Sequence, residues 1–246
     1  MTTSAINHTE KLQELLKHLR AKLKVAADGQ PFLDDPTHQL VYSFLLWEAS
    51  TAKADLAWKR VQSAVVDMNE LRICLFDEIV AILGERYPRV EERAMRLRAA
   101  LNDIYKREHA VTLEPLKKMN KREARQMVES LDGVPQYVSA RVMLIGLGGH
   151  AVPIDERLLG ALISVGALPE DATLEKGASI LERQIKAADA LEAHLVLQSW
   201  SEEFSPAVVN PAAVTGAAPT GATRSRSTGA ARKTSTRSAR GPRKKS

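Results

Sequence analysis

The 246-residue chain contains a single cysteine, Cys74, and only 4% of its residues are aromatic. One cysteine excludes a disulfide framework, and it excludes any zinc or iron–sulfur site whose ligands are cysteines of this chain alone. No stretch approaches the roughly 18 apolar residues of a transmembrane helix. Residues 1–9 also lack the apolar core of a secretory signal. We therefore expect a soluble cytoplasmic protein that makes no membrane contact.

Acidic residues are absent from residues 206–246, which contain nine basic residues among Ala, Gly, Pro, Ser and Thr. The basic residues are Arg224, Arg226, Arg232, Lys233, Arg237, Arg240, Arg243, Lys244 and Lys245. The rest of the chain has 26 basic and 30 acidic residues, so the net charge of +5 combines a body of −4 with a tail of +9. Such a segment buries too little apolar surface to offset its ordering entropy. We expect a disordered tail, either an arm for nucleic acid or a solubilising linker.

The body has helical patterns and no alternating strand pattern. Leucines at 12, 15, 16, 19 and 23 form one stripe at helical spacing. Asp35 followed by Pro36 is typical of a helix start, and residues 40–47 are nearly all apolar, which predicts a central buried helix. The fold class is therefore all-α.

Further boundaries follow from capping residues. Thr51 and Asn69 are candidate N-caps for the next two helices, and Gly84 is the candidate end of the second. Pro88 would open a long charged helix that reaches Glu108. Asn120, followed by an acid three positions later, resembles a capping box.

Residues 127–168 predict a helix, a tight turn at Gly133, a second helix from about Gln136, a glycine-rich loop and a third helix. Gly133 stands where a turn between two helices needs a positive φ. The backbone around Gly133, Val134 and Gln136 would then direct N–H groups and a helix dipole at one point, which suits a phosphate oxygen.

The same segment resembles the endonuclease III superfamily of helix-hairpin-helix DNA glycosylases. Residues 131–135, LDGVP, resemble the family hairpin LPGVG, and the tract HAVPID at 150–155 resembles the loop that ends in the family's catalytic aspartate. From Tyr137 to Asp155 is 18 positions, the family's lysine-to-aspartate spacing. Looser similarity at Asp35-Pro36, at Leu40–Leu46 with Thr51, and at His194–Leu197 extends the resemblance over about 33–204.

The resemblance implies that Asp155 stabilises the charge that develops on the deoxyribose as the glycosidic bond breaks. Its other interpretation is an N-cap of the helix that follows, and both roles are compatible. Tyr137 stands at the lysine position and cannot form a Schiff base, so β-lyase chemistry by that route should be absent. Pro135 replaces the second hairpin glycine and has no N–H to donate. The iron–sulfur loop is missing, so we expect no metal or cofactor, although a monovalent cation at the hairpin is compatible with the resemblance.

The implied organisation is an N-terminal helical extension (1–30), a two-lobed helix-hairpin-helix glycosylase-like domain (31–205) and the disordered basic tail (206–246). We expect a monomer that binds double-stranded DNA and is associated with the nucleoid. The leading hypothesis is a monofunctional DNA glycosylase of base-excision repair that acts on a flipped base. One alternative is a catalytically inactive DNA- or chromosome-binding protein of the same fold. Another is a helical scaffold whose tail binds RNA or acidic proteins.

Other polar residues receive structural interpretations. Glu48, beside a tryptophan in an apolar helix, is either a base-pocket carboxylate or a helix-edge or satisfied buried charge. His150 and His194 lack metal-ligand partners at usable spacing, so we expect structural roles. Cys74 lies in an apolar helical pattern and is expected to be inert core.

Overall fold

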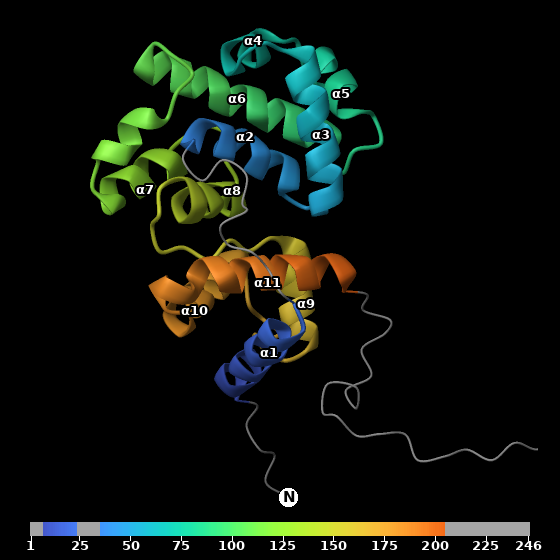
Figure 1. Ribbon diagram of the computed structural model, residues 1–246, viewed down its shortest axis with the longest axis vertical. Helices are drawn as coiled ribbons and strands as arrows, with labels where there is room; N and C mark the ends of the chain where they lie inside the picture. Colours follow the sequence, from blue (N-terminus) through green and yellow to red (C-terminus); the bar gives the residue numbers. More distant parts are fainter. Residues whose placement is uncertain (1–6, 24–34, 205–246) are drawn as a thin grey trace, which may run out of the picture. The chain divides into compact units, whose positions relative to one another are not determined.

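The computed structural model describes residues 7–23 and 35–204, and these residues form helices without any strand (Figure 1). The α-helices are α1 (His8–Lys22), α2 (Pro36–Leu46), α3 (Thr51–Ala64), α4 (Met68–Ile73), α5 (Phe76–Leu83), α6 (Val90–Glu108), α7 (Lys121–Glu129), α8 (Gln136–Arg141), α9 (Glu156–Ser164), α10 (Leu174–Gln184) and α11 (Ala190–Glu203). Short 3-10 turns cover Glu114–Lys118 and Ala187–Asp189, and a π-helical turn, η3 (Val142–Gly146), extends α8. The all-α prediction is confirmed. The basic tail lies outside the described residues.

The first group of helices is built around α2, as its apolar sequence predicts. α2 contacts α3, α6, α8 and η3, while α4 and α5 pack against α6 (Figure 1). Nearly every residue of α2 is buried, including the polar Gln39 and Ser43, which bond to each other. A helix that is apolar all round can only be stable when neighbours cover all its faces, and α2 meets that condition.

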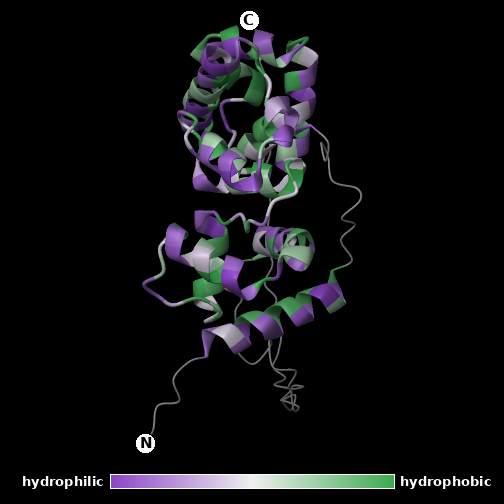
Figure 2. Ribbon diagram, turned by 90° about the vertical axis from the view of Figure 1, so that its left-hand side faces the viewer, coloured by the Kyte–Doolittle hydropathy of each residue, from purple (hydrophilic) through white to green (hydrophobic). Residues whose placement is uncertain are grey.

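The second group contains α1, α9, α10 and α11. α11 contacts α1 and α9, and α10 contacts α9. The four leucines at 12, 15, 16 and 19 of α1 are buried on one face, and the hydrophilic residues between them give the first helix after the N-terminus its purple bands (Figure 2). Arg20 pairs with Glu192 at 3.1 Å, and the ring of His8 bonds the carbonyl of Gly166 at 2.9 Å. The predicted N-terminal extension is therefore a helix that packs against elements near the other end of the described chain. The predicted boundary at residue 30 falls outside the described residues.

Two helix starts differ from the predicted ones by one or two residues. The N-cap of α3 is Ser50, whose hydroxyl accepts from the N–H of Lys53, so Thr51 is the first helical residue. The N-cap of α4 is Asp67, which accepts from the N–H of Glu70 at 2.7 Å, so the prediction of Asn69 is wrong. In both cases an earlier side chain reaches the first free N–H groups of the helix.

The segment between Asp67 and Gly84 is also two helices rather than one. α4 ends at Ile73, its C-cap Cys74 has an extended ψ of 140°, and α5 starts after Leu75. Gly84 ends α5 as predicted, with φ +96°. α6 begins at Val90, two residues after Pro88, because Arg89 adopts the left-handed conformation with φ +51°.

The helical hairpin consists of α7, the turn at Gly133 and α8. Gly133 has the predicted positive φ, +75°, and a Cβ there would lie 2.9 Å from the carbonyl oxygen of Arg96. The N–H of Asp132 donates to Asp103 Oδ2 at 3.0 Å, and Arg107 donates to both Asp103 and Ser130. The hairpin is thus attached to α6 at a backbone approach that only glycine permits.

We predict that Gly133→Ala lowers the free energy of unfolding by about 1–3 kcal/mol, because alanine at positive φ is strained and its methyl group meets the Arg96 carbonyl. Gly160→Ala is the matched control, since Gly160 lies within α9 and a methyl group there would meet no neighbouring atom within 4 Å. That change should raise the free energy of unfolding by about 0.5–1 kcal/mol. Urea denaturation of both variants measures the difference. Equal effects would contradict the assignment of the hairpin turn.

Candidate nucleic-acid interface and carboxylate site

Asp155 is the N-cap of α9. Its Oδ1 accepts a hydrogen bond from the N–H of Leu158 at 2.9 Å, and the residue is only 1% exposed. The capping interpretation of Asp155 is thus correct as a description of its structure. Capping leaves the second carboxylate oxygen available for another partner, so it does not decide whether Asp155 also has a chemical role.

The second oxygen of Asp155 takes part in a reciprocal contact that we call the Glu48–Asp155 clasp. The N–H of Glu48 donates to Asp155 Oδ2 at 3.3 Å, and Glu48 Oε1 accepts from the N–H of Glu156 at 2.7 Å. Glu48 follows the end of α2, and Glu156 is the first residue of α9. Each carboxylate therefore satisfies an N–H group from the opposite segment, and the clasp joins the end of α2 to the start of α9.

Glu48 adopts a conformation that sequence patterns did not reveal. Its φ of +54° is left-handed, which costs a non-glycine residue about 1–2 kcal/mol. This conformation turns the chain directly after Trp47, so that both the N–H and the carboxylate of Glu48 face the start of α9. Burial raises the pKa of the Glu48 carboxyl, and the nearby negative charge of Asp155 raises it further.

A cation lies beside this pair of carboxylates. Arg157 Nη2 is 3.6 Å from Asp155 Oδ2, and Arg157 Nη1 donates to the carbonyl of Ala49 at 3.0 Å. Arg157 therefore offsets part of the negative charge in the clasp and contacts the same turn as Glu48. Its Nε and Nη2 have no hydrogen-bond partner in the described part of the chain.

Arg93 fixes the other side of the turn. It is fully buried, and its Nη2 donates to the carbonyl oxygens of Trp47 and Pro88. Its guanidinium lies 5.0 Å from the ring centroid of Tyr87, and burial lowers its pKa to about 10, so it stays charged at neutral pH. The guanidinium of Arg89, the N-cap of α6, lies 4.8 Å from the ring centroid of Trp47, and those of Arg93 and Arg96 lie 5.7 and 5.6 Å from it. Arg93 thereby holds the Trp47–Glu48 turn against the segment that precedes α6.

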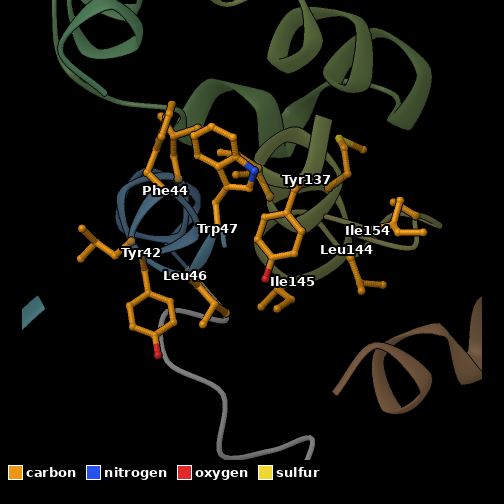
Figure 3. Packing of buried hydrophobic residues seen from close by; sticks show 14 of the residues in the cluster. Tyr42, Phe44, Leu46, Trp47, Tyr137, Leu144, Ile145 and Ile154 are labelled. Carbon is orange, nitrogen blue, oxygen red and sulfur yellow. The ribbon is translucent and has the colours of Figure 1, made fainter. Parts of the chain in front are cut away.

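Tyr137, predicted at the family lysine position, is buried rather than open to a cleft. It lies among apolar residues of the core, including Trp47 and Ile145 (Figure 3), and is 2% exposed. Its hydroxyl donates to Gln198 Oε1 at 3.0 Å, and Gln198 Nε2 donates to Glu202 at 2.8 Å. Burial raises the pKa of the phenol, so it is neutral. Among the described residues, no hydrogen bond joins Tyr137 to Asp155. No sequence motif around Gln198 indicates that its side chain accepts a hydrogen bond from Tyr137.

The predicted phosphate-binding hairpin has its donors partly occupied. Gln136 is exposed and Val134 is half-buried, but the N–H of Val134 donates to the carbonyl of Leu131 at 3.3 Å within the turn. Pro135 is the N-cap of α8 and has no N–H. Gly133 provides the turn itself. The nine basic residues of the tail lie outside the described residues, so their role stays a prediction.

The two histidines and the cysteine that the sequence singled out differ in burial: His194 is buried, Cys74 is half-buried and His150 is exposed. His194 is buried against Arg141, whose Nε lies 3.3 Å from His194 Nε2, and burial holds the pKa of His194 well below its usual range. The His150 ring bonds the carbonyl of Ile185 at 3.0 Å. Cys74 is half-buried at the end of α4, and burial raises the pKa of its thiol. Within residues 7–23 and 35–204, no three His, Cys, Asp or Glu residues could together hold a metal ion, and no helix is long and apolar enough to cross a membrane.

The structure is similar to solved DNA glycosylases. Endonuclease III, trapped as a covalent intermediate with DNA, matches with a TM-score of 0.59 and 12% identity over 81% of this chain and 86% of that one. A thermostable thymine-DNA glycosylase gives 0.56 and 15% over 79% and 85%. The 3-methyladenine DNA glycosylase of H. pylori, bound to 1,N6-ethenoadenine, gives 0.59 and 13% over 80% and 97%. This chain has the fold of the helix-hairpin-helix DNA glycosylases. Neither family models nor curated proteins match its sequence.

The clasp predicts a pH-dependent effect of Glu48→Gln. A carboxyl whose pKa is raised on folding contributes stability below its unfolded pKa and loses it as the pH rises through the folded value. Glutamine does not titrate and retains the oxygen that accepts from Glu156. The free energy of unfolding of Glu48→Gln minus that of the parent should therefore be larger at about pH 7.5 than at about pH 4.

Urea denaturation at the two pH values measures this difference. Glu14→Gln, at an exposed position of α1, is the control and should show little pH-dependent difference from the parent. A Glu48→Gln difference that is constant with pH, or that favours the variant at the lower pH, would contradict the described environment of Glu48.

Proposed function

We propose that this protein binds double-stranded DNA and hydrolyses the N-glycosidic bond of a flipped nucleotide, as a monofunctional glycosylase of base-excision repair. The observation that carries the proposal is the position of Asp155, a buried carboxylate at the start of α9, in a chain with the DNA glycosylase fold. The carboxylate is held by a backbone N–H of its own helix, so its position is set before any ligand binds. No cofactor is required by this chemistry, and a monovalent cation at the hairpin stays a prediction.

A preorganised carboxylate suits this reaction for electrostatic reasons. Breaking the glycosidic bond develops positive charge on the deoxyribose, and a fixed negative charge next to that sugar stabilises the transition state more than the ground state. The same carboxylate can orient or deprotonate the attacking water. Tyr137 cannot form the imine that a lysine would form, which supports hydrolysis without a β-lyase step.

The proposed reaction requires the clasp to open. Asp155 is 1% exposed, and its Oδ2 faces Glu48 and Arg157, so a sugar cannot reach it in the described conformation. The contact that must break is the 3.3 Å hydrogen bond from the N–H of Glu48. The left-handed φ of Glu48 favours such a movement, because leaving that conformation relieves backbone strain.

A second candidate function rests on the same burial. If the clasp stays closed on DNA, Asp155 is only a helix cap, and the protein is a non-catalytic DNA- or chromosome-binding protein of this fold. The 1% exposure of Asp155 favours this alternative, because no sugar can reach the carboxylate while the N–H of Glu48 is bonded to it. The two candidates share DNA binding and differ in turnover.

We predict that Asp155→Asn abolishes glycosylase activity on whichever damaged duplex the parent cleaves. Removing one preorganised group of this kind costs on the order of 3 kcal/mol or more in the transition state, which is at least about 100-fold in rate. The measurement is single-turnover release of base from a panel of duplexes with different lesions. The abasic product of the parent should stay uncut until alkali is added, because Tyr137 provides no lyase step.

Asparagine caps a helix nearly as well as aspartate, so the variant should remain folded, and circular dichroism checks this. Its DNA affinity should stay close to that of the parent. Turnover by Asp155→Asn at the parent rate would show that Asp155 is only a cap. DNA binding by a parent protein without activity on any lesion would support the second candidate function.

The basic tail, residues 206–246, should contribute to DNA affinity through its positive charge. Removal of residues 206–246 takes away nine positive charges from a body of net charge −4, so it should weaken DNA binding and flatten the plot of log affinity against log salt. Each lost phosphate contact lowers that slope by about 0.9. Fluorescence anisotropy at several salt concentrations measures the slope. Unchanged affinity and slope would show that the tail does not contact DNA.

A further inference from the structure

A cavity of about 450 Å³ is lined by residues of α3, by Leu83 at the end of α5 and by the segment that joins α5 to α6. Figure 1 shows α3 beside α5 and this connecting segment. Its volume is within the range of about 300–1,000 Å³ that is typical of ligand sites. One wall consists of α3 residues that include Lys53, Leu56 and Arg60, and the other is formed by residues 83–88. Asp155 is not among the residues that line it, so the cavity is separate from the clasp.

Three cations surround this cavity, against one lining carboxylate, Glu85. Lys53 and Arg86 are exposed and form no ion pair with any other described residue. Exposed cations that gather around one cavity without acidic partners provide a favourable site for an anion. This local excess of positive charge contrasts with the body of the protein, which is acidic overall.

Arg60 is held in place at the cavity wall. Its Nη1 donates to the carbonyl of Leu83 at 2.6 Å, and this position depends on Gly84, because a Cβ on Gly84 would lie 2.8 Å from the same nitrogen. Gly84 has φ +96°, a conformation that side chains rarely adopt. The guanidinium therefore has one donor engaged and a fixed orientation, which leaves its other N–H groups for a ligand.

The cavity lining also includes apolar residues, and one of them is linked through Arg93 to the turn before Glu48. Leu56 is 52% exposed and lines the cavity together with the three cations. Tyr87 and Pro88 line the cavity, and the carbonyl of Pro88 accepts from Arg93, which also holds the Trp47 carbonyl. One buried arginine thus connects the cavity wall to the turn that carries Glu48.

We propose that this cavity binds the sugar–phosphate backbone of duplex DNA, with Lys53, Arg60 and Arg86 contacting phosphate oxygens and Leu56 packing against a deoxyribose. This proposal rests on the proposed function, because it requires that the protein binds DNA. It adds a phosphate site beyond the hairpin and the tail. Arginine suits such a site because its planar N–H groups match phosphate oxygens, while lysine supplies a point charge.

The test uses the full chain and the double variant K53Q/R86Q, which removes two exposed charges without touching the core. The matched control is K17Q/K22Q, which removes two exposed charges from α1. With an undamaged duplex, K53Q/R86Q should bind roughly tenfold more weakly at low salt, and the slope of log affinity against log salt should fall by about 1–2. The control should change both quantities much less.

A second measurement locates the contact on DNA. Duplexes in which single phosphates are replaced by neutral methylphosphonates should lose affinity for the parent at each contacted phosphate. K53Q/R86Q should become insensitive to replacement at one or two of these positions, and K17Q/K22Q should keep the parent pattern. Unfolding by urea verifies that all variants have parent stability.

Three results would overturn the proposal in distinguishable ways. If the parent does not bind duplex DNA, the proposed function fails and this site fails with it. If the parent binds DNA and K53Q/R86Q keeps the parent slope and methylphosphonate pattern, only the cavity proposal is wrong. If K53Q/R86Q loses binding of a free deoxynucleoside monophosphate while its DNA affinity is unchanged, the cavity is a small-molecule site instead.

Discussion

Two hydrogen bonds join the end of α2 to the start of α9: the Asp155 carboxylate accepts from the N–H of Glu48, and the Glu48 carboxylate accepts from the N–H of Glu156. Most of the candidate site depends on this clasp. Asp155 also caps α9 through its other oxygen, Glu48 has a left-handed φ within the clasp, and Arg157 lies beside Asp155. Because the two helices belong to different groups, the clasp is also a direct connection between them.

Buried cations determine how firmly the clasp is held. Arg93 has no exposed surface, and it bonds the carbonyls of Trp47 and Pro88 instead of a carboxylate. A charge buried in this way is costly unless its donors are satisfied. The two carbonyls satisfy Nη2, while Nη1 has no hydrogen-bond partner among the described residues, so Arg93 ties the Trp47–Glu48 turn to Pro88. The backbone strain at Glu48 has the opposite effect, because it favours loss of the hydrogen bond from the N–H of Glu48 to Asp155. The balance between these two effects decides whether Asp155 can be reached by a ligand.

The parts of the fold that depend on local chemistry could be predicted from the sequence. Asp35 before a proline, the leucine stripe of α1 and the positive φ of Gly133 each follow from a few neighbouring residues. Asp155 as the cap of α9 is of the same kind. The resemblance to a family added the expectation that Asp155 has a catalytic role and that Tyr137 stands at the lysine position, and the similarity to solved glycosylases supports the fold that the resemblance implied.

The features that were not predicted arise from contacts between distant segments. Glu48 is 107 positions from Asp155, and Tyr137 is 61 positions from Gln198, whose side-chain oxygen accepts its hydrogen bond. No local pattern encodes such pairs. The break between α4 and α5 was missed for a related reason: Arg98, on α6, donates to the carbonyl of Cys74 at this junction, so a distant side chain satisfies a group that a continuous helix would have used.

We propose that Asp155 stabilises the sugar of a flipped nucleotide once the clasp opens. A crystal structure of the full chain on a duplex that contains a stable abasic-site analogue tests this most directly. We expect the hydrogen bond from the N–H of Glu48 to Asp155 to be broken and the Asp155 carboxylate to face the sugar of the flipped nucleotide. A complex in which DNA is bound while Asp155 remains buried under an intact clasp would contradict it.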